Sequence, residues 1–448
     1  MTDKSPLKNV LKTSLPAVVD LSSQTFMWTI EAILIGKISA AAFGGVGMAV
    51  QIIIVVLTVL LTFIVGSSII INRYLGANNR WEANHILGQA LMLGIIMAVL
   101  IAFVWYFGAT HIFKLIKEGG SEARKAGIVY LRTVALFAPV VLTNFVALGI
   151  VRGAGDTRQA MTINLSVNGL NLILAPIFIF GLFGFPQLQV RGAALAMGTA
   201  HSLGFFATLY LLRSHKSILF LSFRELTTPN FKTFRRLFNA GVPTTVEQLV
   251  WAFGQLVVTS YAAVLGITVL ATHQAFLRIQ AILSMFYMGF GLGAMTLMGK
   301  HLGADQHQVA EKTAHTASWV VFVFSCVVFL FMVIFRKQLI AIFTSEAQVV
   351  LLGAKVIVVF ALVQIPKALD GVLMGNLRGA GDLKWLMWVT IASVLILEIG
   401  LNWVLVFMFN FTLMALWLVH LGDESIRSVL NYRRFKGGKW KIMDLWCL

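Results

Sequence analysis

Long apolar runs, separated by short polar segments, repeat along the whole chain. A transmembrane helix needs about 20 mostly apolar residues, and the pattern offers two sets of such runs. The first set is 13–37, 46–71, 86–109, 127–150, 159–183 and 191–213; the second is 237–264, 271–298, 315–335, 350–375, 385–409 and 411–432. The sequence therefore predicts an all-α integral membrane protein with twelve transmembrane helices, whose last span is interrupted by Asp423, Glu424 and Arg427.

The two sets of spans are related by an internal duplication. The five residues Arg-Gly-Ala-Gly-Asp occur at Arg152–Asp156 and again at Arg378–Asp382, 226 positions later. The register continues upstream, where equivalent residues lie 227 positions apart: Pro16 and Pro243, Asp20 and Glu247, Gly66 and Gly293, and Leu75-Gly76-Ala77 and Leu302-Gly303-Ala304. Repetition at a fixed period indicates a repeated structural unit. We expect two six-helix, pseudo-twofold lobes, 1–213 and 237–448, joined by a linker at 214–236.

The composition supports the membrane assignment, and the charges set the topology. Hydrophobic residues make up 58% of the chain and charged residues 12%, about half the charged share of soluble domains. With the N-terminus inside, inside segments carry 23 of the 35 Lys and Arg residues and outside loops carry 9. Positively charged loops face the cytoplasm. We therefore expect a multi-pass protein of the cell (inner or plasma) membrane with both termini and the linker cytoplasmic, and no nucleic-acid partner despite a net charge of +17.

Each copy of the repeated motif ends one predicted span and begins the next. Glycine suits the left-handed residue that follows a helix C-terminus, and Asp156 and Asp382 suit the N-caps of the next helices. Arg152 and Arg378 would complement the negative helix ends. Two interpretations remain: a hinge or gate on the cytoplasmic face, or a capped turn that serves folding alone.

The order of these features resembles the multidrug and toxic compound extrusion (MATE) family. The resemblance rests on the duplicated six-span halves, the paired turn motif, and the C-terminal segments Asp423–Arg427 and Lys436–Lys441, and it covers essentially the whole chain. It implies twelve spans in two lobes, alternating access, and export of organic, often cationic, compounds. It also implies coupling to an inward proton or sodium gradient.

Polar residues inside the first and seventh spans form matching stripes. A charged group at the centre of a membrane helix costs about 2.5–3.5 kcal/mol, so a cavity, a partner or an ion must offset it. At 100° per residue each set falls on one helix face: Asp20, Gln24, Trp28 and Glu31 in the first span, and Glu247, Trp251 and Gln255 in the seventh. The stripes suit a water-filled central vestibule; hydrogen bonding that only joins helices is the alternative.

The fifth span presents a row of amides. Asn164, Asn168 and Asn171 lie on one face, where they can bind sodium or hold a carboxyl group in place, or only join helices. One branch of the MATE family places an Asp just before the proline of this span. Here that position is Ala175, before Pro176, and the first-span acid is Glu31, a departure that speaks against a simple carry-over of the family's paired-Asp proton site.

The second half holds more charge inside its spans. Lys367 and Asp370 are neighbours on the tenth span, and Asp370 matches an acid that another family branch uses in its cation site. Arg278 and Lys367 would neutralise two of the three acids Glu247, Asp370 and Glu398. We expect Asp370 and Glu247 to form an ion or substrate site, with a static Lys367–Asp370 ion pair as the alternative.

Other functions leave little trace in the sequence. It shows no metal-ligand spacing, no nucleophile signature and no phosphate-binding glycine loop, so we expect neither an enzyme nor a cofactor beyond the coupling ion, H⁺ or Na⁺. A flippase for a lipid-linked or polyprenyl-linked headgroup is the alternative, and it would favour a basic cavity. The expected partners are small organic cations and membrane lipid, and the expected state is a monomer.

Overall fold

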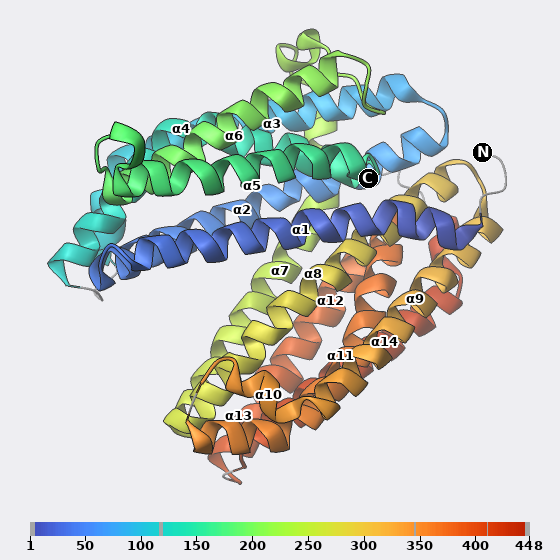
Figure 1. The fold of residues 1–448 in the computed structure, drawn as a ribbon. Coiled ribbons are helices and arrows are strands. Elements are labelled where there is room, and N and C mark those ends of the chain that lie inside the picture. Colours follow the sequence, from blue (N-terminus) through green and yellow to red (C-terminus); the bar gives the residue numbers. More distant parts are fainter. Residues whose placement is uncertain (1–4, 116–119, 345, 410, 444–448) are drawn as a thin grey trace. The chain divides into compact units, whose positions relative to one another are not determined.

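The structure of the chain is almost entirely helical, as the apolar pattern predicts. A computed structural model describes residues 5–115, 120–344, 346–409 and 411–443, and these contain helices and turns but no strands (Figure 1). The helices of the first half are α1 Pro6–Gly36, α2 Ala40–Gly76, α3 Arg80–Leu115, α4 Ser121–Gly153, α5 Thr157–Phe180 and α6 Gln189–Arg213. The described ends lie within several residues of the predicted spans.

The second half repeats this series with one interruption. Its helices are α7 Phe231–Val264, α8 Ile267–Gly303, α9 His307–Ile334, the short α10 Arg336–Ala341, α11 Ala347–Ala380, and α14 Leu413–Lys436. Between α11 and α14 one continuous helix consists of α12 Leu383–Ser393, a π-helical segment Val394–Leu401, and α13 Asn402–Phe407. Ten of the described helices are long and apolar enough to cross a membrane. α7 and α14 are not among these ten, although both have the length of a span.

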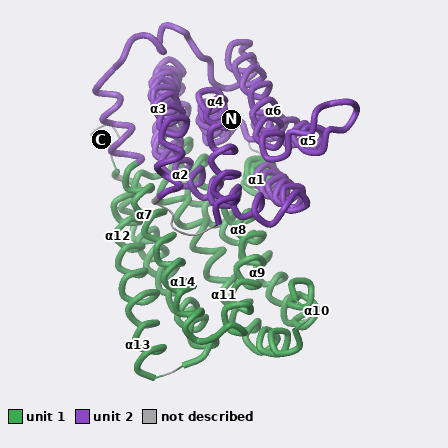
Figure 2. Tube along the Cα trace, turned by 90° about the vertical axis from the view of Figure 1, so that its left-hand side faces the viewer, with its two compact units in different colours: residues 1–18, 242–448 green, residues 19–241 purple. Residues whose placement is uncertain are grey.

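The chain folds into two compact units, coloured separately in Figure 2. One unit is 19–241, and the other combines 1–18 with 242–448. The boundaries fall inside α1 and α7, so the first turns of α1 pack in the unit formed by the second half. There Gly289 and Gly293 of α8 lie so close to α1 that an added Cβ would be 2.4 Å from Val18 Cγ2 and 2.1 Å from Ser14 Oγ.

The same helix of each repeat is central to its unit. In unit 19–241, α4 contacts α2, α3, α5 and α6; in the other unit, α11 contacts α8, α9, α12 and α14. Glycines allow the close approach: a Cβ on Gly153 would lie 1.9 Å from Ser68 Oγ of α2, and one on Gly379 would lie 2.3 Å from the Met295 carbonyl of α8. The repeated motif therefore sits at the end of the helix that contacts most of its neighbours.

The turn of the motif has the conformation that its glycines predict. Gly155 and Gly381 are left-handed, with φ of 89° and 94°. In both copies the glycine amide donates to the arginine carbonyl, at 3.0 and 2.9 Å, and the aspartate amide donates to the residue before that arginine, at 3.1 and 2.9 Å. This pair of hydrogen bonds is the Schellman motif, so the predicted C-terminal glycines are confirmed.

The linker between the repeats packs on α3. His85 Nδ1 lies 2.6 Å from Glu225 Oε2, and the side chain of Gln89 binds the backbone of Glu225, Thr228 and Asn230 at 2.8–2.9 Å. The segment between α6 and α7 is thus bound to α3 within unit 19–241.

Candidate functional site

An ion pair joins the first span of unit 19–241 to the repeated motif. Asp20 of α1 is fully buried, and its Oδ2 accepts a hydrogen bond of 2.7 Å from Arg152 Nη1 at the end of α4. Its Oδ1 accepts another, also of 2.7 Å, from Asn164 Nδ2 of α5. One carboxylate thus connects three helices, and the buried charge of Asp20 has its counter-ion.

The unit formed by 1–18 and 242–448 contains the equivalent ion pair. Arg378, at the end of α11, donates through Nη2 to Oε1 of Glu247 in α7, and Glu247 is buried. Arg152 and Arg378 are the arginines of the two motif copies, and Asp20 and Glu247 are equivalent in the duplication. The repeat therefore preserves a charge pair between spans as well as a turn, and each of these acids has an arginine as its partner.

The aspartates of the motif do not cap helices through their side chains. Asp156 and Asp382 occupy the N-cap positions of α5 and α12, as predicted, but neither side chain makes a capping hydrogen bond. Asp156 Oδ2 accepts from the Ile218 amide at 3.3 Å, and Asp382 accepts from Arg434 at 2.6 and 3.2 Å. The capping role was wrong because both carboxylates bind the segment at or beyond the end of their repeat's last span instead.

Unit 19–241 contains a partly open cavity of about 240 Å³. Residues from α1, α2, α4, α5 and α6 form its wall, together with Trp105 of α3. Most of the wall is apolar, and it includes four of the predicted site residues, namely Gln24, Trp28, Glu31 and Asn164. The aromatic side chains of the wall are Trp28, Phe43, Trp105, Tyr130 and Phe145. The polar residues of the first span thus have two different surroundings. Asp20 forms an ion pair with Arg152, whereas Gln24, Trp28 and Glu31 line the cavity.

Glu31 is the acid of this cavity, and it has no cationic partner among the described residues. It is buried, with 6% of its surface exposed. Its carboxylate contacts the Tyr130 hydroxyl at 3.4 Å and Asn171 Nδ2 at 3.5 Å, and Asn171 Nδ2 also lies 2.9 Å from Met27 Sδ. Because a bare charge at this depth is costly, the carboxyl group needs a proton or a bound cation.

The amides of α5 hold polar groups of α1 in place. Asn164 donates to Asp20, Asn171 to Glu31, and Asn168 to the Ser23 hydroxyl at 3.0 Å. Of the three uses that the sequence left open, Asn164 and Asn171 bind carboxyl groups, whereas Asn168 joins α5 to α1 through a hydroxyl group. Ala175, where one family branch has an acid, is buried and brings no charge to the site.

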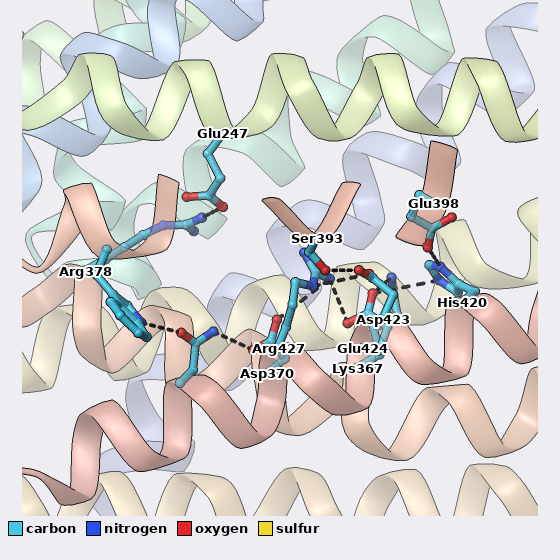
Figure 3. Close-up of polar contacts among 12 residues, drawn as sticks. Glu247, Lys367, Asp370, Arg378, Ser393, Glu398, His420, Asp423, Glu424 and Arg427 are labelled. Carbon is cyan, nitrogen blue, oxygen red and sulfur yellow. Dashed lines mark hydrogen bonds and ion pairs between the residues drawn. The ribbon is translucent and has the colours of Figure 1, made fainter. Parts of the chain in front are cut away.

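The unit formed by 242–448 and the chain's start contains a buried polar network between α11, the α12–α13 helix and α14 (Figure 3). Lys367 Nζ lies 2.5 Å from Glu424 Oε1, and Arg427 Nη2 lies 2.8 Å from Glu424 Oε2. Asp370 accepts from Asn431 Nδ2 at 2.8 Å and lies 3.8 Å from Arg427 Nη2. The alternative of a static Lys367–Asp370 ion pair was therefore wrong, because both residues contact α14 and each has its partner there.

The network continues to a second group of acids. Arg427 Nε lies 3.4 Å from Asp423 Oδ2, and the Ser393 hydroxyl donates to Asp423 Oδ1. Glu398, in the π-helical segment, contacts Nδ1 of His420. Glu398, His420 and Asp423, hereafter the Glu398 cluster, each offer one ligand atom within 4.8 Å of the others, so these residues can hold a metal ion although no sequence spacing indicated one.

The remaining predicted residues lie outside these contacts. Arg278 is exposed and makes no ion pair within the described part of the chain, so its proposed neutralising role was wrong. Trp251 faces Lys367, whose Nζ is 5.9 Å from the ring centroid, and Gln255 is half-buried. Glu247 and Asp370 bind different partners, Arg378 and Asn431, so no described contact joins them in one ion site.

Several functional candidates escaped the sequence reasoning. The sequence analysis did not single out Tyr130 or His420, and it named Glu424 only as an interruption of the last span. A usable signal existed on α14, where His420, Asp423, Glu424 and Arg427 follow helical spacing and therefore share a face. Tyr130 gave no such signal, because a single tyrosine in an apolar span has no distinguishing pattern.

Comparison with known proteins finds one family match in each of the two repeats. The sequence model of the MatE family matches residues 16–177 and 243–404. An uncharacterized transporter of Bacillus subtilis, YisQ, is 25% identical over 95% of this chain and 93% of its own length. A probable multidrug resistance protein of Thermotoga maritima, NorM, is 26% identical over 97% of this chain and 93% of its own length.

Solved structures share the fold over nearly the whole chain. A MATE structure in the straight conformation superposes with a TM-score of 0.89 at 21% identity, covering 98% of both chains. A MOP superfamily transporter from Pyrococcus furiosus, described as having a binding pocket of reverse polarity, gives a TM-score of 0.87 at 21% identity over 98% of both chains. The two-repeat helical architecture is therefore the one seen in those transporters.

Proposed function

The chain belongs to the MatE family of transporters, and from that premise we propose that it exports organic cations in exchange for a proton bound at Glu31. The observation that carries the proposal is the largely apolar cavity of unit 19–241 with a buried acid on its wall. The Thermotoga maritima relative is described as a probable multidrug resistance protein, which supports this substrate class.

The wall of the cavity suits flat cations. Five aromatic side chains line it, and aromatic faces attract cations, by about 2 kcal/mol or more where water is excluded. Glu31 supplies the one acidic side chain of the wall; of its basic residues, Arg152 is already paired with Asp20, which leaves His201. Such a lining does not suit the pyrophosphate of a lipid-linked headgroup.

The surroundings of Glu31 favour a proton over sodium as the coupling ion. Hard metal cations are held by several oxygen ligands, whereas the described contacts of this carboxylate are one hydroxyl and one amide nitrogen. A proton would neutralise Glu31 and weaken its attraction for a cationic compound, so proton entry and compound release would be coupled in one cavity. We also propose that the protein lies in the plasma membrane with both termini in the cytoplasm, which the excess of basic residues in the inside loops supports.

The test is transport by the purified chain in liposomes. Ethidium movement is followed under an imposed pH gradient and, separately, a sodium gradient, with Glu31→Gln and the control Glu122→Gln, an exposed acid at the start of α4. We expect the pH gradient to drive ethidium in the wild type and the control, and Glu31→Gln to lose that response. Transport driven by sodium alone, or a pH response retained by Glu31→Gln, contradicts the proton at Glu31; absence of ethidium transport by the wild type contradicts the substrate class.

A further inference from the structure

The Glu398 cluster is buried in the unit formed by 1–18 and 242–448, whereas the residues that line the cavity described above belong to unit 19–241. Glu398, His420 and Asp423 are 2%, 5% and 2% exposed. Figure 3 shows Glu398 and His420 pointing toward each other from the π-helical segment and α14, with Asp423 one turn along α14. Their ligand atoms already lie within 4.8 Å of one another, so little rearrangement would bring them around one ion.

Charge is unbalanced around this cluster. The described buried network contains the four carboxylates Asp370, Glu398, Asp423 and Glu424, but only the two permanent cations Lys367 and Arg427. Both cations lie nearest to Glu424, at 2.5 and 2.8 Å, and Glu398 contacts neither of them. With the four carboxylates ionised and His420 neutral, two negative charges are therefore left over Asp370, Glu398 and Asp423, and of these three only Glu398 has no permanent cation within 4 Å. Buried charges without compensation are strongly unfavourable, and a divalent cation would supply the missing charge at one point.

Unpartnered lone pairs at the cluster give an independent indication of a ligand. Glu398 Oε2 and His420 Nε2 are buried without a hydrogen-bond partner, since the nearest carboxylate oxygen to His420 Nε2, Glu424 Oε1, is 3.8 Å away. Asn402, which is fully buried, donates through Nδ2 to the Glu398 carbonyl at 2.9 Å, while its Oδ1 has no partner. His273 of α8 is 2% exposed, and neither of its ring nitrogens has a partner. Buried polar atoms in proteins are normally satisfied, and all of these atoms except a protonated ring nitrogen are electron-pair donors.

The backbone at the cluster is also unusual. Val394–Leu401 is π-helical, and Glu398 lies in the middle of it. Such segments are rare and occur frequently at functional sites. Here the wider turn places Glu398 against His420 and leaves Asn402 four residues further along the same helix.

We propose that Glu398, His420 and Asp423 bind a divalent transition-metal cation such as Zn²⁺ or Mn²⁺, with the Asn402 amide oxygen as a further available ligand. One imidazole and two carboxylates are a donor set that such cations accept, whereas hard cations prefer oxygen alone. Outer contacts that orient the ligands are in place, since Ser393 and Arg427 both bind Asp423. The site goes beyond the proposed drug export, because none of its residues is among those that line the cavity of unit 19–241.

Equilibrium metal binding tests this site independently of transport. The full chain is purified with a tag that contains no histidine, stripped with EDTA, and titrated with Zn²⁺, Mn²⁺ and Co²⁺ by calorimetry, with bound metal counted by mass spectrometry. The visible Co²⁺ spectrum reports the coordination directly. His420→Gln and Glu398→Gln are compared with His111→Gln, which changes an exposed histidine of α3; a monodisperse elution profile confirms folding.

We expect one high-affinity metal per wild-type chain and per His111→Gln chain. His420→Gln and Glu398→Gln should bind on the order of 100-fold more weakly, since even outer contacts of metal sites are worth 10–100-fold. If either variant aggregates, the metal affinity of Asp423→Asn and the Co²⁺ spectrum of the wild type test the site in its place. A wild-type chain that takes up no metal after stripping overturns the proposal and leaves protons to balance the charge; unchanged affinity in the folded variants overturns it as well.

Discussion

Replacing Asp20 by Asn should destabilise the protein more than any other neutralisation of an acid in unit 19–241. Asn keeps the shape of the side chain and can still accept the 2.7 Å hydrogen bond from Asn164. It removes the counter-ion of Arg152, whose side chain is only 12% exposed. Removing one partner of a buried ion pair costs about 3–5 kcal/mol, because the other charge stays buried and uncompensated.

A double-mutant cycle isolates the charge interaction from the rest of the substitution. Asp20→Asn, Arg152→Gln and the double variant are unfolded at equilibrium in mixed detergent and SDS micelles and followed by tryptophan fluorescence, with Glu122→Gln as the exposed control. We expect the double variant to recover about 2–3 kcal/mol relative to the sum of the single changes. A coupling energy below about 0.5 kcal/mol, the usual scatter of additive sites, would refute the view that this pair is a buried, desolvated link between α1 and α4.

Two further substitutions, Gly379→Ala and Lys367→Met, test the unit formed by 1–18 and 242–448 by the same unfolding measurement, each against a matched control. Gly379→Ala should lower the free energy of unfolding by about 1–3 kcal/mol through overpacking, because its Cβ would lie 2.3 Å from the Met295 carbonyl. The control Gly169→Ala, whose Cβ would have no atom within 4 Å, should be neutral or slightly stabilising. Equal effects of the two changes would contradict the close approach of α11 and α8. Lys367→Met should cost about 3 kcal/mol, since it removes one of the two cations at buried Glu424, and exposed Lys355→Met on the same helix should cost little. Equal stability of the two lysine variants would contradict the ion pair.

Sequence reasoning was most successful where structure depends on neighbours along the chain. Apolar length predicted the spans, and the repeated glycines predicted left-handed turns at Gly155 and Gly381, because few other residues adopt that conformation at low cost. It was weakest for charge partners. Lys367 and Asp370 are adjacent on one helix, yet Lys367 binds Glu424, 57 residues away, and Asp370 binds Asn431, 61 residues away.

The amino-acid sequence alone determined the class of protein, the number and order of its spans, and the duplication, since each follows from hydrophobicity, local backbone preference or register. Only the tertiary structure decided that Asp20 and Glu247 are neutralised by the arginines of the repeated motif, that Glu31 is left without a cation in a cavity, and that Glu398 lies beside His420. The physical reason is that a buried charge takes whichever counter-charge helix packing brings within a few ångströms, and the packing depends on contacts distributed over the whole unit.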